Sequence, residues 1–410
     1  MEVQRTARTR ILRVILFEMK ITVVSQALTP QYGGSAVSEA SLCGSLQTLH
    51  PISVWCRAGA LDAEFARSFG LTDVKEVHPW DVVRAWRDPS HWIRRELAET
   101  DVLHINGHWR WENILLARLA HRLRIPYLLQ PRGMLWLGMR KVPLKKLFNR
   151  LWGNWAVQHA QRVIALSQFE TRQWDAYGIS PERTAVIPNA VPTPTQEKGD
   201  ALLAPPFFLY FGRIEPRKNL VFLVRAFAKY VSDGGQADLL FVGPPQRRYD
   251  HVVARETRLL GISDRVRFLP AVYGPEKAAL LRQALAVVYP AVGEPFGRVP
   301  FETLSAGGVP IVPVESGSAE YIAPFFREAL YPIADRDALV AALRQMERLT
   351  GSKRAARLQS AQTWVAQNLN WNSVTEHFLN LYTQVRNESA AIRPAPSSAD
   401  GALHPARAFE

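Results

Sequence analysis

Residues 286–313 read AVVYPAVGEPFGRVPFETLSAGGVPIVP. The apolar runs 286–290 and 309–313 predict two strands, and a helix is expected to begin between them near Val299. The order strand, loop, helix, strand is that of a parallel α/β unit, and open α/β sheets bind ligands in the loop at the carboxyl end of such a strand. The segment therefore predicts a ligand site that carries two carboxylates, Glu294 and Glu302.

The chemistry of this segment suits a phosphorylated sugar. A helix N-terminus offers unpaired N–H groups and the positive end of its dipole to a phosphate group. Carboxylates at the same place suit sugar or ribose hydroxyls. Two Glu residues eight positions apart also occur by chance on a solvated helix, so the spacing alone is weak evidence.

A second segment supplies cations. The apolar run 207–211 predicts a buried strand, and it leads into GRIEPRKNL at 212–220, which places Arg213 and Lys218 five positions apart at a helix entrance. Arg offers a planar fork to phosphate oxygens and Lys a mobile point charge. The alternative is an ordinary basic turn in which Pro216 begins a helix.

Together these segments resemble the retaining glycosyltransferases of family 4, and the resemblance extends from residue 19 to about residue 382. It implies the GT-B architecture, an α/β fold in which two doubly wound Rossmann-like domains face each other across a cleft. The motifs that carry it, besides those above, are Gly33-Gly34, QPRGM at 130–134, ALSQFE at 165–170, IPNAV at 187–191 and AGGVP at 306–310. The 130–134 motif and the basic residues after it resemble the polysaccharide-assembly branch of the family.

The resemblance also implies roles for single residues. Arg213 and Lys218 would stabilise the negative charge that grows on the leaving diphosphate, and Glu294 would face the donor sugar without becoming a covalent nucleophile. Glu302 would hold the ribose hydroxyls. The remaining donor-binding candidates are Gly33, Gly34, Arg132, Phe296, Gly297, Arg298 and Val299. Arg132, in the loop after the predicted strand 127–130, is placed for the donor phosphate or for an anionic acceptor. For the glycine pair, a tight turn is the alternative.

Histidines give one further catalytic candidate. Many relatives carry a His-x-His segment after the fourth strand, whereas this chain has His104-Ile105-Asn106-Gly107-His108, with Asn106 at the second position. His104 lies within a predicted strand, where a core histidine is the default. His108 lies in the following loop, so it is the candidate catalytic histidine.

A metal site is not expected. Other glycosyltransferases hold a divalent ion with an Asp-x-Asp motif, and the chain has one such triplet, Asp335-Arg336-Asp337. It precedes a predicted helix, so capping explains it. We expect no metal and no cofactor, with a nucleotide-diphosphate sugar as the donor substrate.

Alternating strand and helix patterns define the organisation. Strands are predicted at 21–25, 52–56, 102–105, 127–130, 163–166 and 184–187, and again at 208–211, 238–242, 266–268, 286–289 and 309–313. The expected parts are an N-terminal extension (1–18), an acceptor domain (19–190), a linker (191–206), a nucleotide-sugar domain (207–352), C-terminal helices that cross back to the first domain (353–387) and a disordered tail (388–410). The helical aromatic residues Trp364, Trp371 and Phe378 are also explained by core packing. Met19 is a plausible natural start, and the two cysteines, Cys43 and Cys56, are expected to be buried free thiols.

Charge is distributed unevenly along the 410 residues, whose net charge is +13. No Asp or Glu occurs between Glu112 and Glu170, and three Trp residues are interleaved with basic ones. The basic residues of this stretch are Arg118, Arg122, Arg124, Arg132, Arg140, Lys141, Lys145, Lys146, Arg150 and Arg162. Such a stretch suits the headgroup layer of an anionic membrane, although a solvated basic face or nucleic acid would also explain it. No nucleic-acid motif accompanies it, and no apolar run reaches the roughly 18 to 20 residues that cross a membrane. We therefore expect a cytoplasmic protein that lies on the inner face of the membrane through residues 118–162.

Two classes of function follow. In the first, the chain is a metal-independent hexosyltransferase (EC 2.4) that acts on a glycan or lipid-linked glycan acceptor, such as an intermediate of capsule, exopolysaccharide or lipopolysaccharide synthesis. In the second, it binds an acidic partner, anionic lipid or nucleic acid, without turnover. A GT-B epimerase, or a glycogen-type phosphorylase or synthase, is a further enzymatic alternative. The joint presence of Arg213, Lys218, Glu294 and Glu302 favours the first class.

Overall fold

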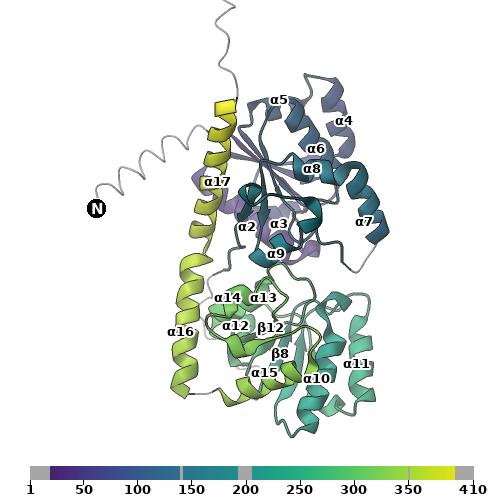
Figure 1. Cartoon of the computed structure of the whole chain (residues 1–410), viewed down its shortest axis with the longest axis vertical. Helices are drawn as coiled ribbons and strands as arrows, with labels where there is room; N and C mark the ends of the chain where they lie inside the picture. Colours follow the sequence, from purple (N-terminus) through teal and green to yellow (C-terminus); the bar gives the residue numbers. More distant parts are fainter. Residues whose placement is uncertain (1–18, 139–141, 193–205, 350, 393–410) are drawn as a thin grey trace, which may run out of the picture.

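Two parallel sheets, each covered by helices on both faces, follow one another along the long axis of the molecule (Figure 1). The computed structural model describes residues 19–138, 142–192, 206–349 and 351–392. We call residues 19–192 the first domain and residues 206–349 the second domain. The expected α/β fold with two doubly wound Rossmann-like domains is confirmed.

The sheet of the first domain has the strand order β3-β2-β1-β4-β5-β6-β7, with every pair parallel. Strands such as ITVVS at 21–25 are buried along their whole length, because helices cover both faces of a parallel sheet. The strands are β1 (Ile21–Ser25), β2 (Ile52–Arg57), β3 (Val74–Val77), β4 (Val102–Asn106), β5 (Tyr127–Gln130), β6 (Arg162–Ala165) and β7 (Thr184–Val186).

The sheet of the second domain repeats this topology with the order β10-β9-β8-β11-β12-β13. Its central strand, FFLYF at 207–211, is buried at every position. The strands are β8 (Phe207–Phe211), β9 (Asp238–Val242), β10 (Val266–Leu269), β11 (Val287–Val288), β12 (Pro310–Pro313) and β13 (Leu330–Tyr331).

Helices connect the strands in both domains. Those of the first domain are α2 (Gly34–Leu49), α3 (Ala63–Ser68), α4 (Pro79–Arg87), α5 (Trp92–Glu99), α6 (Trp111–Arg122), α7 (Val142–Phe148), the π-helix η2 (Asn149–Gly153), α8 (Asn154–Gln158) and α9 (Gln168–Arg172). Those of the second domain are α10 (Leu220–Ser232), α11 (Tyr249–Leu259), α12 (Gly274–Gln283), α13 (Arg298–Ala306), α14 (Ala319–Ile322) and α15 (Arg336–Arg348). Short 3-10 helices are η1 (Pro30–Tyr32), η3 (Asp175–Tyr177), η4 (Pro181–Arg183), η5 (Pro216–Lys218), η6 (Ser263–Arg265) and η7 (Arg327–Ala329).

Two C-terminal helices join the domains along one side (Figure 1). Helix α16 (Gly351–Asn368) packs against α13 of the second domain, and α17 (Trp371–Ile392) packs against α2 and β4 of the first. Phe378 and Tyr382 belong to the core of the first domain. The tail expected from residue 388 is wrong for its first five positions, because α17 continues to Ile392 and Glu388 forms an ion pair with Arg162 at 2.7 Å. Residues 1–18 and 393–410, and residues 193–205 of the expected linker, lie outside the described part of the chain.

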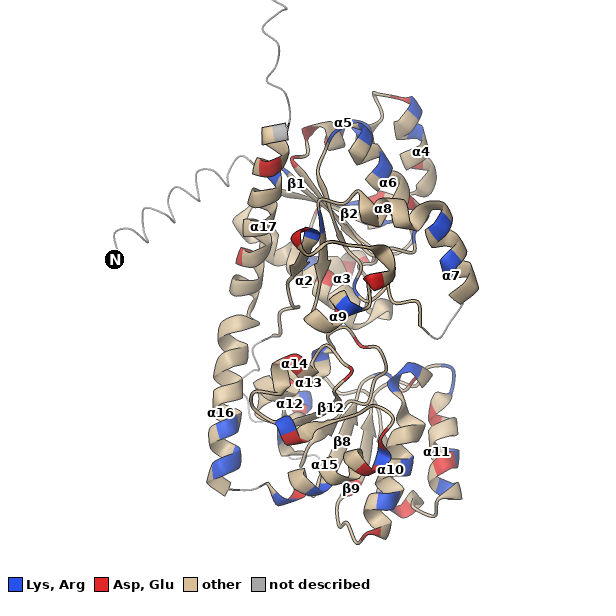
Figure 2. Ribbon diagram, in the orientation of Figure 1, with Lys and Arg blue, Asp and Glu red and all other residues tan. Residues whose placement is uncertain are grey.

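The basic stretch of the first domain is mostly engaged with neighbouring side chains. Arg118, Arg122 and Lys145 lie over the rings of Trp155, Trp86 and Trp109 at 5.2, 5.3 and 5.5 Å. Arg132 and Arg162 are in ion pairs. Arg140 and Lys141 lie outside the described residues. Figure 2 shows the basic residues of α7 at the outer edge of the domain.

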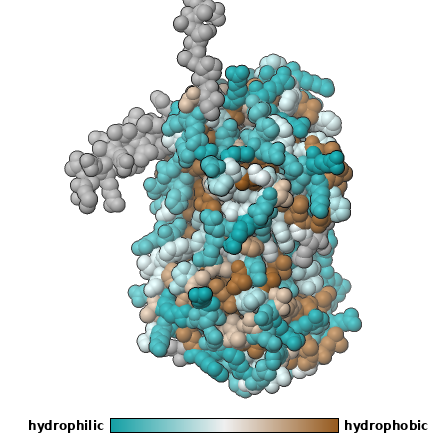
Figure 3. Space-filling model, viewed as in Figure 1, coloured by the Kyte–Doolittle hydropathy of each residue, from teal (hydrophilic) through white to brown (hydrophobic). Residues whose placement is uncertain are grey.

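Lys146 and Arg150 are exposed cations with no ion-pair partner among the residues described. On the same helical segment, Leu144, Leu147 and Leu151 remain 59, 53 and 48% exposed. Figure 3 shows apolar and hydrophilic side chains side by side at this edge. We call these five residues the α7 surface. Within the described residues, no helix is long and apolar enough to cross a membrane.

Candidate functional site

The strand orders locate one crevice in each domain. Strand order reverses between β1 and β4 in the first sheet and between β8 and β11 in the second. Open α/β sheets bind ligands at the carboxyl ends of the strands at such a reversal. Gly212 and Arg213 follow β8, and Glu294 follows β11. The second crevice therefore holds the segments that carry the sequence motifs.

Lys218 and Glu294 meet in this crevice. Lys218 Nζ lies 2.7 Å from Glu294 Oε2 and donates to the hydroxyl of Tyr289 at 2.7 Å. The Tyr289 hydroxyl donates to Glu294 Oε2 at 3.2 Å, and its ring lies 4.7 Å from Lys218 Nζ. Both charged side chains are largely buried, at 13 and 17% exposure. An ammonium and a carboxylate 76 residues apart are thus held together at the carboxyl end of the sheet.

The charge of Glu294 is set by this arrangement. Burial by itself would raise the pKa of Glu294, but the Lys218 ammonium, the charge of Arg217 and the Tyr289 hydroxyl together bring the pKa below its ordinary value. Glu294 is therefore ionised at neutral pH. It can accept hydrogen bonds from hydroxyls or stabilise positive charge that develops nearby.

Glu302 anchors a second group of charges on α13. Its Oε2 lies 2.8 Å from Lys277 Nζ, and its Oε1 lies 3.4 Å from Arg298 Nη2. Lys277 comes from α12 and also lies over the ring of Phe211, at the end of β8. Glu302 is therefore paired with two cations and lies near the end of the central strand, which Gly212 and Arg213 follow.

The first domain closes over these cations through Gly33 and Gly34. A Cβ built on Gly33, whose φ is +63°, would lie 3.9 Å from the guanidinium carbon of Arg213. Arg298 Nη1 donates to the carbonyl of Gly34 at 3.4 Å. The two glycines thus face Arg213 and Arg298 across the domain boundary. A side chain at either position would occupy the space between the domains.

The N-terminus of α13 is open to an anion. Gly297 precedes the helix with φ +72°, no side chain caps the helix, and its first turn contains no acidic residue. The backbone N–H groups of Arg298 and Val299 are the ones placed to meet a phosphate. The Phe296 ring does not line the crevice, which corrects its assignment to donor binding. It is buried and stacked on Phe301 at 4.1 Å.

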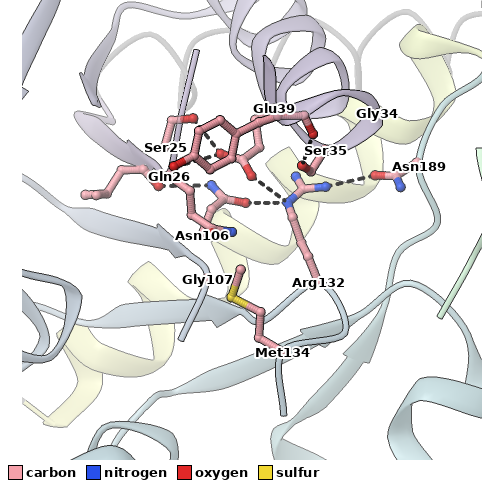
Figure 4. A network of polar contacts seen from close by, with 12 residues as sticks. Ser25, Gln26, Gly34, Ser35, Glu39, Asn106, Gly107, Arg132, Met134 and Asn189 are labelled. Carbon is pink, nitrogen blue, oxygen red and sulfur yellow. Dashed lines mark hydrogen bonds and ion pairs between the residues drawn. The ribbon is translucent and has the colours of Figure 1, made fainter. Parts of the chain in front are cut away.

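Arg132 belongs to a buried network of the first domain and not to the donor site, which corrects its assignment (Figure 4). Its Nε donates to Asn106 Oδ1 at 2.8 Å, its Nη1 donates to Asn189 Oδ1 at 3.0 Å, and Glu39 Oε1 lies 3.6 Å away. Glu39 Oε2 in turn accepts from Ser25 Oγ at 2.5 Å. The network fills the crevice between β1 and β4, and the Arg132 side chain is only 5% exposed.

His108 is buried, which contradicts its assignment as a catalytic residue. Its Nε2 is bonded to Asn149 Oδ1 at 3.0 Å, and the rings of Trp109, Phe148 and Tyr177 surround it. Burial lowers the pKa of His108 to about 4, so it is neutral at physiological pH. No substrate can reach it in this arrangement.

His104 is a core histidine, as expected. Its Nδ1 bonds the hydroxyl of Tyr382 at 2.7 Å, and its ring stacks on Phe378. The Asp335 side chain accepts from the N–H of Ala338 at 2.9 Å, which confirms that this aspartate caps α15. Cys43 and Cys56 are buried free thiols, also as expected.

Sequence reasoning missed Lys277, Tyr289 and Glu39. Tyr289 lies in the apolar run 286–290 directly after β11, so its position was a usable signal. Lys277 sits on α12 among exposed charges, and nothing in its spacing indicates that it reaches Glu302. Glu39 follows Gly34 by five positions on α2, and only the fold brings it to Arg132.

Comparison with known proteins matches both domains. Residues 195–364 match the family model described as glycosyl transferases group 1, and residues 32–194 match the model described as Glycosyltransferase Family 4. A D-inositol 3-phosphate glycosyltransferase of Actinosynnema mirum is 32% identical over 261 residues, which are 56% of this chain and 59% of that protein. One from Salinispora tropica is 27% identical over 79% of this chain and 66% of its own length. In the first three curated relatives, the match spans 39 to 59% of the relative's length.

Solved structures share the fold. The crystal structure of Anabaena HepE in complex with UDP and glucose matches with a TM-score of 0.68 at 19% identity, over 89% of this chain and 100% of that chain. The sucrose-phosphate synthase of Thermosynechococcus elongatus matches with a TM-score of 0.68 at 18% identity, over 90% of this chain and 100% of that one. At such identities the match establishes the architecture alone.

Proposed function

This chain belongs to the GT-B glycosyltransferases of family 4, and we propose that it moves a sugar from a nucleotide-diphosphate donor to a glycan acceptor with retention of configuration. The observation that carries the proposal is the arrangement of Lys218, Glu294 and Tyr289 at the carboxyl end of the second sheet. Close to the same strand ends lie Arg213, at the domain boundary, and the uncapped N-terminus of α13.

The chemistry assigns each group a task. The bond between the anomeric carbon and the diphosphate oxygen breaks, and its electron pair stays on the diphosphate. The acceptor hydroxyl forms the new bond on the same face and passes its proton to the leaving phosphate. Arg213, Lys218 and the N–H groups of Arg298 and Val299 would stabilise the growing negative charge. Glu294 would hold sugar hydroxyls or stabilise the electron-poor anomeric carbon.

Glu302 would bind the ribose of the nucleotide. Its carboxylate lies close to the end of β8, and in the free protein it is held by Lys277 and Arg298. Ribose hydroxyls would replace part of these contacts. Because the Anabaena neighbour holds UDP and glucose, UDP and UDP-glucose are the first probes. We propose that the reaction needs no metal.

The activity is tested by nucleotide release. The purified protein is incubated with UDP-glucose, GDP-mannose or ADP-glucose, each with EDTA and with extracted membrane glycolipid. The proposal expects nucleotide release from one donor that depends on the glycolipid, and an α-linked product from an α-linked donor. Absence of release with every donor would contradict the activity. A β-linked product would contradict retention.

The α7 surface is proposed to bring the acceptor domain to an anionic membrane. Leu144, Leu147 and Leu151 follow a spacing of three and four residues, so they share one helix face, and Lys146 and Arg150 lie beside them. The two cations also line a hollow of about 230 Å³ with Asn154 and Tyr177. Exposed leucines beside cations that have no ion-pair partner within the described part of the chain suit the boundary of acyl chains and anionic headgroups. The acceptor would then be a lipid-linked intermediate of capsule, exopolysaccharide or lipopolysaccharide synthesis.

Vesicle binding tests this surface. Each basic residue near an anionic membrane contributes about 1 kcal/mol, so the double variant K146E/R150E should bind phosphatidylglycerol vesicles at least about 30-fold more weakly. The matched control is R255E/R258E on α11, which changes the same net charge on the second domain and should bind normally. Equal losses in both variants would show that net charge, and not the α7 surface, governs binding.

A further inference from the structure

Glu170 is a buried carboxylate that binds two backbone segments at once. Its Oε1 accepts from the N–H of Gly133 at 2.5 Å, and its Oε2 accepts from the N–H of Leu166 at 2.7 Å. Its own N–H donates to Ser167 Oγ at 3.2 Å. Among the described residues it has no cation within ion-pair distance. Burial raises the pKa of Glu170 to about 7; the N–H groups of Leu166 and Gly133 and the charge of Arg132 lower it, and the charge of Glu294 raises it.

Placing a carboxylate here without an ion pair costs free energy, so the two backbone contacts need an explanation. Gly133 belongs to the turn after β5, where Arg132 and Gly133 both have positive φ, at +51° and +78°. Such a conformation is unfavourable for Arg and persists only where its surroundings hold it. The Arg132 side chain is held by Asn106 and Asn189, and the Gly133 N–H is held by Glu170.

The turn after β5, held in this way, contacts the residues next to Glu294. A Cβ on Gly133 would lie 2.9 Å from the Pro295 ring, so the two are in close contact. A Cβ on Gly293 would lie 2.5 Å from the ring of Trp136. The hydroxyl of Ser167, in the second segment held by Glu170, donates to the carbonyl of Pro295 at 2.5 Å. Gly293 and Pro295, on either side of Glu294, therefore pack against segments of the first domain.

We propose that Glu170 is a positioning residue. It holds the turn after β5 and the segment 166–167 of the first domain, and these two segments contact Gly293 and Pro295. Through these contacts Glu170 sets the position of Glu294. Arg132 supports the same turn from its other side. The link to catalysis rests on the proposed function, whereas the link between Glu170 and the Gly293–Pro295 segment does not.

The variant E170Q separates this role from bulk stability. Gln keeps the shape of the side chain but accepts at one atom only, and its NH2 group would face the second backbone N–H. The matched control is E96Q, which alters a half-buried carboxylate of α5 that bonds Lys75 and Trp55 in the same domain. In Figure 1, α5 lies at the end of the first domain away from the second domain. The milder variant S167A removes the bond to the Pro295 carbonyl and the cap on the Glu170 N–H, but it leaves both contacts of the Glu170 carboxylate in place. It serves if E170Q folds poorly.

Hydrogen exchange of the full chain gives the direct test. In E170Q, exchange should accelerate roughly tenfold or more at one of the two amides, Gly133 or Leu166, since the NH2 group leaves one buried donor without its acceptor. It should also accelerate in a peptide that covers residues 290–298 of the second domain. S167A should accelerate that peptide and the Glu170 amide that it uncaps, but not the amides of Gly133 and Leu166. E96Q should change none of these. Unchanged exchange at 290–298 in both E170Q and S167A would overturn the proposal.

Kinetics distinguish positioning from loss of fold. If the proposed function holds, E170Q should lower kcat at least tenfold while the Kd for UDP stays within about threefold of the parent, because the nucleotide contacts the second domain. A fall of folded fraction with unchanged kcat per folded molecule would show a purely structural role. Failure of the unmodified protein to bind UDP or other nucleotides would count against the proposed function and leave the exchange result standing.

Discussion

Replacement of Lys218 by Met should change stability and turnover in separable ways. The ammonium lies 2.7 Å from both Glu294 and Tyr289, and the paired charges are 13 and 17% exposed. Removal of one partner of a fully buried pair costs about 3–5 kcal/mol. Because residual exposure, Arg217 and the Tyr289 hydroxyl still favour the Glu294 charge, we expect a loss of about 2–3 kcal/mol in the free energy of unfolding, below the fully buried range.

The pH dependence follows from the lowered pKa of Glu294. In the parent protein, the Lys218–Glu294 pair stabilises the fold fully at pH values above 4.5, the ordinary pKa of a Glu carboxyl. This stabilisation is lost as the pH falls through the lower pKa that Glu294 has in the folded protein. In K218M, burial acts without the ammonium and raises the pKa of Glu294, so the folded variant takes up a proton on acidification. The difference in the free energy of unfolding between the parent and K218M should therefore be largest at pH 7 to 8 and should become smaller toward pH 4.

Urea unfolding at these pH values and turnover per folded molecule form the assay. Turnover of K218M should fall by about 10²–10³, the usual effect of losing a group that stabilises transition-state charge. The double variant K218M/E294Q should regain most of the stability, because no unpaired charge remains, and none of the turnover. Recovery of turnover in the double variant, or turnover of K218M within threefold of the parent, would refute the role of Lys218 at the phosphate.

Two further predictions concern Glu302 and His108. E302A should weaken UDP binding about 10- to 100-fold, since hydrogen bonds to a charged group contribute about 1.5–3 kcal/mol; calorimetry below the melting temperature measures this, and an unchanged Kd would remove Glu302 from the ribose site. H108Q should leave turnover per folded molecule unchanged. Folded His108 has a pKa of about 4, so between pH 6.5 and 4 the unfolded chain binds a proton that the folded chain does not, and the parent loses stability as the pH falls. The urea midpoint of H108Q should therefore fall less steeply with pH than that of the parent. Equal pH dependence of the two midpoints would contradict the burial of His108.

The sequence predicts the central strands well because hydrophobic runs in parallel sheets are continuous. Strands β1, β5 and β9 have the predicted bounds, and the other predicted strands differ by one residue at one or both ends. Strand β3 was missed because VKEV is short and only partly buried, and β13 has two residues. In the last turns of α17, Glu388 contacts both Gln384 on the same helix and Arg162, which lies 226 residues away and gives no local signal in the sequence.

Site residues were predictable where strand ends fix their place, and not where side-chain direction decides. Lys218 and Glu294 follow neighbouring parallel strands, so their meeting follows from topology. His108 also follows a strand, but its hydrogen bond to Asn149, which in turn donates to the Tyr177 hydroxyl, holds it in the core. Arg132 lies in a loop whose backbone turns its side chain away from the second domain and toward Asn106.

Nucleotide binding by the full chain tests the proposed donor site. A ligand that binds only the folded state raises the melting temperature, so the full chain is heated with UDP, GDP, ADP and CMP, each with and without EDTA. We expect a selective rise with one nucleotide that EDTA does not change and that E302A reduces. No rise with any nucleotide would contradict the donor site and favour a protein that binds an acidic partner without turnover. A rise abolished by EDTA would contradict metal independence alone.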